Sequence, residues 1–432
     1  ESPLTKKLES EGAVIHYGQC AENITDDINC VVYTAAINKS NPELMEAVGK
    51  KIPMLTRAEL LGQLMKNYDT PIAVSGTHGK TTTTSMISEV LLAADMDPTI
   101  SVGGILKTIG GNIRVGKSGN FITEACEYTN SFLHFYPKIS VILNIEEDHL
   151  DFFKDLEDIR HSFHQFAALL PSDGTLIING DIDNYQEIYD SLDCNVITYG
   201  SSDMLDYSAS NITYDEKGLV AFDLIKNGKV VDHIQLSVTG DHNVSNALAS
   251  IATAELLQIP METIKKGILS FSGTDRRFEY KGTFNGVTVV DDYAHHPTEI
   301  AATLKAAQHY PHNQVWCVFQ PHTYTRTKAF FHEFAEALSH TDHLVLADIY
   351  AARETDTLGV SSAGLAEEAR KLGTDAHYLP SFEEIEAFLK ENCKSGDLLI
   401  TMGAGDVVKI GEDILKSVSY THLRAHETKA NL

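Results

Sequence analysis

The chain has 432 residues, more than one domain usually contains, so we expect two or three domains. Its formal net charge of −26 argues against nucleic acid or an anionic membrane as a partner, since no basic excess is available to neutralise phosphates. No apolar run approaches the roughly 18 residues that span a bilayer, so we expect no membrane segment. The six cysteines are scattered without a C-x-x-C pair and are interpreted as reduced thiols of a cytoplasmic protein.

Residues 1–69 are expected to alternate helix and strand. The predicted elements are a helix over 4–8, strands over 13–17 and 30–34, and a helix over 42–48. A doubly wound α/β unit should begin with a strand and a glycine turn. Here the pattern opens on a helix, so we expect the first strand and its loop to be missing from this sequence. The small residues at 34–37 end a strand just before a helix begins, which is where an open α/β sheet places a ligand.

Residues 71–92 predict a phosphate-binding loop. A short apolar run, typical of a buried strand, precedes G-T-H-G-K-T at 76–81, and apolar residues recur at helical spacing after it. The glycines let backbone amides close around phosphate oxygens at the start of the helix. Lys80 is expected to reach the β- and γ-phosphates, and the Thr81 hydroxyl to ligate Mg²⁺. Val74 stands where the usual motif has its first glycine, and a plain glycine turn is the alternative.

The phosphate loop opens a central unit, expected over residues 70–272. Its predicted strands lie at 121–124, 139–143 and 175–178, with a helix over 155–170. Three alternating stretches then follow at 211–215, 219–225 and 230–238. Because E-K-G and N-G turns separate them, these stretches predict an antiparallel meander. A long helix is predicted to begin after Gly240.

Two polar side chains follow neighbouring strands of this unit. Glu124 ends a buried strand, where a parallel sheet presents functional groups, and its carboxylate is a hard oxygen ligand suited to Mg²⁺. His149 comes just after the next strand, in N-I-E-E-D-H-L-D. Histidine is a poorer ligand for Mg²⁺. Spacing alone therefore leaves two interpretations open: a metal site, or a solvated acid at position 124 with a histidine at position 149 that caps a strand.

The motif G-T-D-R-R-F at 273–278 is expected to form a polar hinge to a last open parallel α/β domain over 273–417. The domain should begin with a hairpin around Asn285-Gly286. Its predicted strands lie at 287–290 and near 315–319, 343–347, 376–379 and 397–401. The pattern ends near residue 417, and we expect residues 418–432 to be a non-native tail without function.

Polar residues crowd the ends of two strands in this last domain. Asp291, Asp292, His295 and His296 follow the first of them. Zinc is an alternative that we do not favour, since no third ligand stands at a usual spacing, and we expect a polar cluster facing a cleft. Arg326 follows the next strand and could bind a carboxylate bidentately, the alternative being a solvated arginine at a helix start.

From these residues we expect an enzyme of several α/β domains that uses ATP and Mg²⁺. A phosphate loop by itself does not separate a motor, a kinase, a switch protein and a ligase. A guanine-binding switch would need an N-K-x-D motif, which we do not find. A nucleic-acid motor is disfavoured by the negative charge.

Six motifs stand in the order in which they occur in the Mur ligases, the ATP-dependent amide ligases of peptidoglycan precursor synthesis. They are G-T-H-G-K-T, T-E-A-C-E-Y-T-N-S-F-L, N-I-E-E-D-H-L-D, G-D-H-N-V-S-N-A, R-R-F and D-D-Y-A-H-H-P-T-E. From residue 1 to about 417 the chain resembles this family, and most of all its branch that joins L-alanine to UDP-N-acetylmuramate. The resemblance implies a truncated Rossmann-like UDP-sugar-binding domain over 1–69, a P-loop ATPase domain over 70–272 and a C-terminal Rossmann-like domain over 273–417.

The resemblance implies a reaction in two steps. The muramate carboxylate attacks the γ-phosphate of ATP, and the amine of L-alanine then attacks the acyl phosphate. A monomer or weak homodimer is expected. Relatives that add later residues carry a lysine in the helix after D-H-L-D, and residues 161–170 contain none, which favours the alanine-adding branch. Two alternatives stay open: a ligase that recycles a tripeptide onto the same sugar nucleotide, and a truncated fragment that binds ATP without full activity.

The resemblance also implies roles for particular residues. The residues implied to bind ATP are Gly76, Thr77, His78, Gly79, Lys80, Thr81, Thr82, Asn243, Asn246, Arg277 and Asp292. Those implied to act in catalysis are Lys80, Glu124, His149, Arg277 and Asp292. The residues implied to hold Mg²⁺ are Thr81, Glu124 and His149. Those implied to lie near the muramate and alanine sites are His78, His295, His296 and Arg326.

Overall fold

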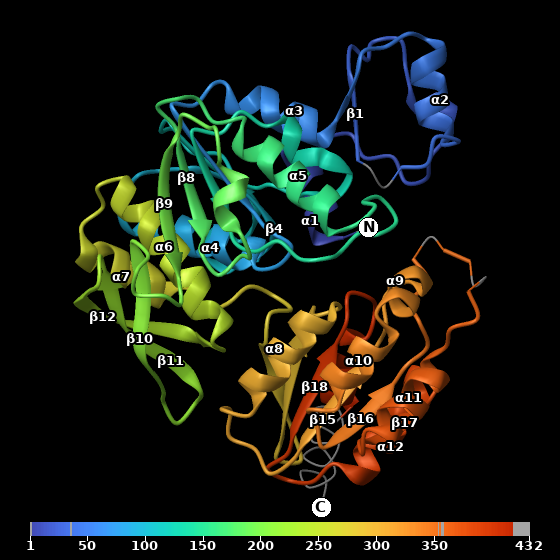
Figure 1. Cartoon of the computed structure of the whole chain (residues 1–432). Helices are drawn as coiled ribbons and strands as arrows, with labels where there is room; N and C mark the ends of the chain where they lie inside the picture. Colours follow the sequence, from blue (N-terminus) through green and yellow to red (C-terminus); the bar gives the residue numbers. More distant parts are fainter. Residues whose placement is uncertain (1, 35–36, 353, 356–357, 418–432) are drawn as a thin grey trace, which may run out of the picture.

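The computed structural model describes residues 2–34, 37–352, 354–355 and 358–417. The predicted tail and residues 35–36 of the predicted ligand-binding strand end lie outside these ranges. In the described residues the strands form sheets of two, ten and six strands, which follow one another along the chain. Figure 1 shows the small N-terminal sheet at one end of the molecule and the six-stranded sheet below the ten-stranded one. The predicted α/β class with mostly parallel sheets is confirmed.

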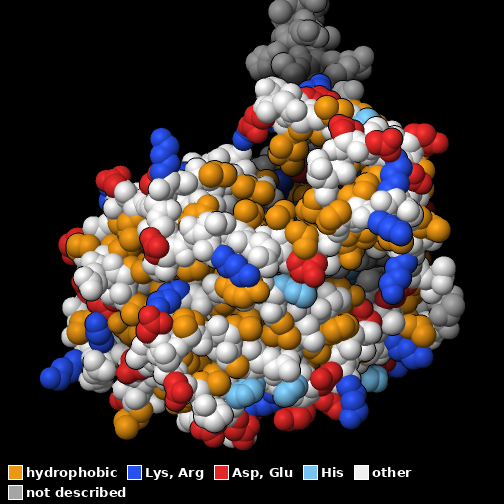
Figure 2. Space-filling model, turned by 90° about the horizontal axis from the view of Figure 1, so that it is seen from above, with side chains coloured by type: hydrophobic (Ala, Val, Ile, Leu, Met, Phe, Trp, Pro, Cys, Tyr) orange, Lys and Arg blue, Asp and Glu red, His pale blue; other side chains and the backbone are white. Residues whose placement is uncertain are grey.

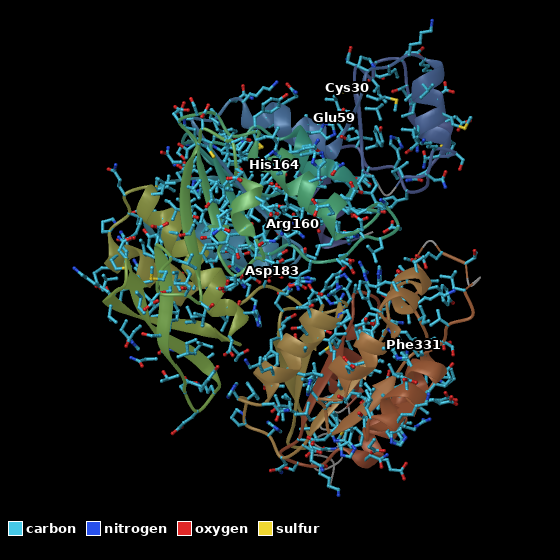
Figure 3. All side chains as sticks on the ribbon, viewed as in Figure 1. Cys30, Glu59, Arg160, His164, Asp183 and Phe331 are labelled. Atoms are coloured by element: carbon cyan, nitrogen blue, oxygen red, sulfur yellow. The ribbon has the colours of Figure 1, made fainter. Side chains whose placement is uncertain are left out.

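The N-terminal part carries the smallest sheet. Its elements are α1 (Pro3–Ser10), η1 (Ala21–Asn23), β1 (Val31–Tyr33), α2 (Pro42–Gly49), β2 (Met54–Thr56) and α3 (Arg57–Met65). β1 and β2 pair in parallel, and Glu59 closes a capping box with Thr56 at the start of α3 (Figure 3). The predicted strand over 13–17 is wrong: these residues form no strand, and Val14 is 79% exposed. An extended segment without a neighbour to complete its hydrogen bonds is not stable as a strand.

The central part is built on the ten-stranded sheet. Its strands are β3 (Thr70–Ser75), β4 (Thr99–Leu106), β5 (Gly111–Arg114), β6 (Asn120–Glu124), β7 (Ile139–Ile142), β8 (Thr175–Asn179), β9 (Asn195–Gly200), β10 (Tyr207–Tyr214), β11 (Leu219–Lys226) and β12 (Lys229–Thr239). Their order is β12-β11-β10-β9-β8-β7-β3-β6-β4-β5. The pairs from β4 to β10 are parallel, whereas β5 and the β10–β12 meander are antiparallel, so the predicted meander is confirmed.

Helices cover both faces of this sheet. They are α4 (Lys80–Ala93), η2 (Lys107–Ile109), η3 (Tyr128–His134), α5 (Leu156–Ala167), η4 (Tyr185–Ile188), α6 (His242–Leu256) and α7 (Met261–Ser270). α4 is buried on nearly every side, and α7 crosses it closely at Gly267, where a Cβ would lie 2.5 Å from Val90 Cα. On the other face Arg160 of α5 donates to the backbone carbonyl of Asp183 at 2.7 Å (Figure 3). The phosphate-loop helix is therefore a rigid core element, which fixes the position of its N-terminus.

The last part is a six-stranded sheet with helices on both faces. Its elements are β13 (Glu279–Phe284), β14 (Val287–Asp292), α8 (Pro297–Ala307), β15 (Val315–Phe319), α9 (Tyr324–Ala329), α10 (Phe331–Leu338), β16 (His343–Leu346), α11 (Ser362–Lys371), β17 (Asp375–Tyr378), α12 (Phe382–Asn392) and β18 (Leu398–Met402). The order is β13-β14-β18-β15-β16-β17, and β13 alone pairs in antiparallel fashion within it. Separate apolar clusters form its two faces, as in a doubly wound sheet.

The start of α8 and the ends of β14 and β15 face the central part (Figure 1). Carboxyl ends of parallel strands therefore meet across the boundary from both sheets, which is where open α/β sheets bind ligands. Figure 2 shows acidic and basic side chains interspersed over one face of the molecule, so the negative excess is not gathered there into one patch. Within the described ranges, no helix has the length and apolar character needed to cross a bilayer.

Candidate active site

The predicted phosphate loop lies between β3 and α4. Gly76 has φ 148° and Gly79, at the N-cap of α4, has φ 83°, a left-handed conformation that favours glycine. A Cβ on Gly79 would lie 2.7 Å from the side-chain oxygen of Asn246, so there is also no space for a side chain. Gly79 has no capping side chain, and the first amides of α4 are therefore available to an anion.

The loop is held in place by the segment after β7. The amide of His78 donates to Asn144 Oδ1 at 2.7 Å, and Asn144 Nδ2 donates back to the His78 carbonyl at 3.1 Å. The amide of Glu146 donates to Thr77 Oγ1 at 2.9 Å. These contacts preorganise the loop before any ligand binds, which lowers the entropic cost of binding phosphate.

Lys80 points back into the loop. Its Nζ donates to the carbonyls of Gly76 at 2.5 Å and Thr77 at 3.0 Å, and to Glu127 Oε2 at 2.9 Å. Burial acts to lower the pKa of Lys80, but the carboxylate of Glu127 outweighs burial and raises that pKa above its ordinary value. Lys80 is therefore a permanent cation at the point where the loop would hold phosphate.

Glu127 is a site residue that sequence reasoning missed. Its carboxylate is only 2% exposed and contacts both Lys80 and His149, whose Nε2 lies 3.6 Å away. Tyr128 stacks on the His149 ring at 4.4 Å. Burial lowers the pKa of His149, so the imidazole is neutral at physiological pH. The available signal was the second acid of T-E-A-C-E, three residues beyond Glu124, but no spacing rule assigns such an acid to a lysine.

Thr81 and Glu124 lie against β4 at Gly103 and Gly104, two neighbouring residues without side chains. A Cβ on Gly103 would lie 2.8 Å from Glu124 Oε2, and one on Gly104 would lie 3.1 Å from Thr81 Cγ2. The Gly103 amide donates to Glu124 Oε1 at 2.5 Å. Glycine at these two positions lets the Glu124 and Thr81 side chains lie against β4, and a carboxylate and a hydroxyl are donor types that fit Mg²⁺. His149 is placed instead beside Glu127, on the Lys80 side of the loop.

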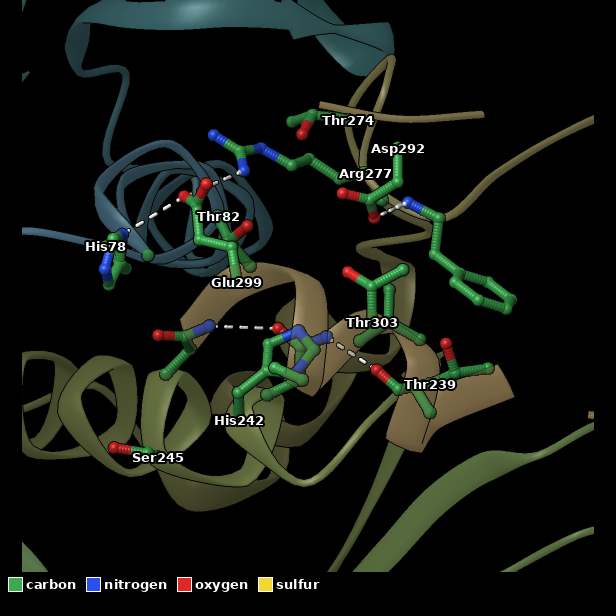
Figure 4. Close-up of a pocket in the computed structure, with 18 of the residues that line it drawn as sticks. His78, Thr82, Thr239, His242, Ser245, Thr274, Arg277, Asp292, Glu299 and Thr303 are labelled. Atoms are coloured by element: carbon green, nitrogen blue, oxygen red, sulfur yellow. Dashed lines mark hydrogen bonds and ion pairs between the residues drawn. The ribbon is translucent and has the colours of Figure 1, made fainter. Parts of the chain in front are cut away.

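A cavity of about 710 Å³ begins at the phosphate loop and extends between the central and last parts (Figure 4). The predicted residues that line it are His78, Gly79, Thr82, Asn243, Asn246, Arg277 and Asp292. Glu299 and His242 also line it and were not predicted. Burial lowers the pKa of His242 to about 4, so this side chain is neutral in the cavity wall. The cavity is large enough for a nucleotide.

Asn243 and Asn246 are already engaged inside the protein. Asn243 Nδ2 donates to the Thr239 carbonyl at 2.7 Å, and Asn246 Nδ2 donates to Asn243 Oδ1 at 3.0 Å. Thr83 Oγ1 of α4 donates to Asn246 Oδ1 at 3.1 Å. These bonds tie α6 to α4, and each amide group keeps a second N–H that a ligand could use.

Asp292 organises the hinge from the end of β14. It accepts hydrogen bonds from the amides of Phe278 at 2.8 Å and Ala294 at 2.7 Å. Burial raises the pKa of Asp292 to about 6, against the opposing effect of Arg277. Arg277 itself lies with its guanidinium 3.8 Å from Glu299. Arg277 of the predicted hinge and Asp292 at the end of β14 therefore both lie in the cavity wall.

The four residues predicted to lie near the second and third substrates meet at the boundary of the two large sheets. The rings of His78 and His296 are 4.8 Å apart, and His295 lies 5.7 Å from His322, to which Arg326 is bonded at 3.3 Å. Arg326 does bind a carboxylate here, that of Asp148 at 2.7 Å. Although burial opposes it, this guanidinium keeps the pKa of Asp148 well below its usual range.

His78, Glu146 and His296 place possible metal-binding atoms within 4.8 Å of one another. The nitrogens of His296 are, however, occupied: Nε2 contacts the Glu147 carbonyl at 3.1 Å, and Nδ1 accepts from the Thr298 amide at 3.4 Å. One neutral tautomer satisfies both contacts and leaves no lone pair for a metal. The preference for a polar cluster over zinc at this strand end agrees with these contacts.

Comparison with known proteins supports the family that the motifs indicated. Residues 1–69, 74–254 and 276–405 match the family models described as Mur ligase family, catalytic domain, Mur ligase middle domain, and Mur ligase, glutamate ligase domain. The UDP-N-acetylmuramate–L-alanine ligase of Lachnospira eligens is 62% identical over 96% of this chain and 91% of its own length.

Solved structures of other proteins support the same family. The UDP-N-acetylmuramate-alanine ligase of Thermotoga maritima superposes with a TM-score of 0.82 at 26% identity, covering 98% of this chain and 92% of that one. A murein peptide ligase of Psychrobacter arcticus shares the fold, with a TM-score of 0.70 at 23% identity over 96% of this chain and 91% of that one. The chain therefore belongs to the Mur ligase family of ATP-dependent ligases.

Proposed function

We propose that this enzyme joins L-alanine to the carboxylate of UDP-N-acetylmuramate and converts ATP to ADP and phosphate. The observation that carries the proposal is the cavity between the phosphate loop and the last domain, in a chain 62% identical to a relative of that name. A nucleotide in this cavity would have its phosphates at the N-terminus of α4. Both large domains would then contact the reacting groups, as the joining of two substrates requires.

The proposed ligation proceeds in two steps. A carboxylate oxygen of the muramate attacks the γ-phosphorus, and the bond to the ADP oxygen breaks, which leaves an acyl phosphate. The alanine nitrogen then attacks the acyl carbon, phosphate leaves and the nitrogen loses a proton. Lys80 is proposed to neutralise charge on the transferring phosphoryl group, since its Nζ is buried, protonated and held in the loop.

Thr81 and Glu124 are proposed to hold Mg²⁺, which would neutralise phosphate charge when bound. The Glu124 carboxylate lies against Gly103 and the Thr81 side chain against Gly104, on neighbouring residues of β4, which supports this assignment. His149 is proposed to lie close to a second ion, supported by its neutral imidazole next to Glu127.

The remaining roles are proposed from position. Both Arg277 and Asp292 line the cavity: Arg277 is proposed to reach the phosphates of ATP from the hinge, and Asp292 to orient the nucleotide from the last domain. Asn243 and Asn246, which also line the cavity, are proposed to contact its base. For the muramate and alanine sites, the proposed residues are His78, His295, His296 and Arg326, which meet where the cavity reaches the last domain.

We also propose the domain limits 1–69, 70–272 and 273–417, and that the enzyme is a monomer or weak homodimer. A cytoplasmic location is proposed because the reaction consumes ATP.

The alternative function, recycling of a preformed tripeptide, has weaker support. The murein peptide ligase is only 23% identical, which shows a shared fold and no more. The decisive test is release of phosphate from ATP with UDP-N-acetylmuramate and a panel of amines. L-Alanine should stimulate release at least about 100-fold over D-alanine, because a positioned amine must fit a chiral site.

Release that depends on the tripeptide and not on L-alanine would contradict the proposal and favour the recycling ligase. Release with no amine at all would indicate a fragment that binds ATP and hydrolyses it. Lys80→Met serves as the control for contaminating ATPases, since it removes the loop cation and leaves the side-chain length nearly unchanged.

A further inference from the structure

Glu299 lies at the crossing point of three elements, and no role for it follows from the motifs. It stands in the first turn of α8, with its side chain only 12% exposed. One carboxylate oxygen, Oε1, is 3.2 Å from His78 Nδ1 of the phosphate loop and 3.8 Å from the Arg277 guanidinium of the hinge. The other oxygen, Oε2, accepts a hydrogen bond from the His295 amide at 3.0 Å. Figure 4 shows Glu299 between His78 and Arg277.

His78 is the partner from the central domain, and it is enclosed by acids on both sides. Its Nε2 lies 3.5 Å from Glu146, a residue of its own domain, and its Nδ1 faces Glu299 of the last domain. The ring of His296 also packs against it, with the two ring centroids 4.8 Å apart. Burial opposes a charge on His78, but the two carboxylates outweigh burial and raise its pKa to about 9.

We propose that Glu299 is a positioning residue that couples docking of the last domain to the phosphate loop, by holding His78 and Arg277 on one carboxylate. The proposal rests on the ligase function for its kinetic consequences. Without Glu299, His78 keeps Glu146 as an acidic neighbour, and Arg277 loses the α8 carboxylate that lies 3.8 Å from its guanidinium. Two cations beside the transferring phosphate would then be free to adopt other rotamers.

The expected effect falls on turnover and not on nucleotide affinity. The amides of the phosphate loop, Lys80 and Asn144 all belong to the central domain, so their contacts do not depend on α8. Transfer of the phosphoryl group, in contrast, needs every charged group in place at once. A carboxylate that aligns two cations across a domain boundary therefore contributes mainly to the transition state.

The test uses the full chain and three variants. Glu299→Gln keeps the size and the amide hydrogen bond but removes the negative charge, and His78→Gln removes the imidazole that faces Glu299. Lys305→Met is the matched control, because Lys305 also lies on α8 and also bonds across the boundary, to Asp241 at 2.5 Å, but has no link to the loop. kcat and KM for ATP are measured by phosphate release, and folding by thermal unfolding.

Glu299→Gln should lower kcat at least about 10-fold and change KM for ATP less than about threefold. His78→Gln should lower kcat by a similar factor, and the double variant should lower it no further, because both changes break one unit. Lys305→Met should stay within about twofold of the parent. A folded Glu299→Gln enzyme with parental kcat, or a double variant whose effects multiply, would overturn the proposal.

A second readout does not depend on turnover. The imidazole of His78, assigned by its loss in His78→Gln, should titrate in NMR spectra near the value of about 9 expected from its two acids. In Glu299→Gln its midpoint should fall by at least about one pH unit, because one of two facing carboxylates is lost. An unchanged midpoint would overturn the proposal. If L-alanine fails to stimulate phosphate release, the ligase function fails while this measurement still decides the role of Glu299.

Discussion

At the scale of single residues, the structure places a buried carboxylate, Glu127, between two groups proposed to face the phosphates. Its side chain is 3% exposed and that of Lys80 16%, so this ion pair is largely desolvated. Removing one partner of such a pair leaves the other charge uncompensated and costs about 3–5 kcal/mol. Glu127→Gln should therefore lower the midpoint of thermal unfolding and reduce kcat at least about 10-fold, both measurable on one preparation.

The control for this prediction is an ion pair of similar length at the surface. Arg160 lies 3.0 Å from Glu187, whose side chain is 63% exposed. Glu187→Gln should change the free energy of unfolding by less than about 1 kcal/mol and leave kcat unchanged, because solvent screens an exposed pair. Equal destabilisation by both substitutions would show that Glu127 is not specifically tied to the phosphate loop.

At the scale of secondary-structure elements, the junction of β3 and α4 depends on one left-handed residue. Gly79→Ala would force a Cβ to 2.7 Å from Asn246 at φ 83°, so it should displace the helix start and weaken ATP binding at least about 10-fold. Gly110→Ala is the matched control: Gly110 also has a positive φ, of 62°, but a Cβ there meets nothing within 4 Å. Calorimetric titration with ATP should therefore give near-parental affinity for Gly110→Ala.

At the scale of the whole molecule, docking of the last domain should depend on pH. His78 has a pKa raised to about 9 by Glu299 and Glu146 against the effect of burial. In the undocked state Glu299 is lost but Glu146, which belongs to the same domain as His78, remains, so the pKa of His78 should lie between the ordinary value of about 6.5 and about 9. A group whose pKa is raised in the docked state stabilises docking fully below its undocked pKa, and this contribution is lost as the pH rises through about 9.

The size of this pH dependence is set by the charged and titratable groups around His78, which are Glu146, Glu299, His296 and Arg277. Burial lowers the pKa of His296 to about 4, so its contribution has the opposite sign and is lost as the pH falls below about 6.5. Small-angle X-ray scattering without nucleotide should show the radius of gyration increasing between about pH 7 and 9.5. His78→Gln should remove that increase, and a parental profile in His78→Gln would contradict the assignment.

Several features of the fold followed from the sequence, because they depend on neighbours in the chain. The strand, glycine turn and helix start around Lys80 are such a feature, and so is the β10–β12 meander with its turns. The strand predicted over 13–17 failed for the opposite reason: a strand needs a partner elsewhere, and local alternation cannot supply it. β4, β5 and β9 were not predicted, since their short or glycine-containing runs carry little periodicity.

The features of the candidate active site also divide into those that depend on neighbours in the chain and those that depend on distant residues. By itself, the sequence determined that a phosphate loop exists, that acids and histidines follow particular strands, and that the motifs are those of Mur ligases, because residue type and short spacing encode these properties. Only the tertiary structure decided that Glu127 pairs with Lys80, that Arg326 pairs with Asp148 and that Glu299 reaches His78. These partners are far apart in the chain, and packing of whole sheets and helices, not local spacing, brings their charges into a buried site where each needs a partner.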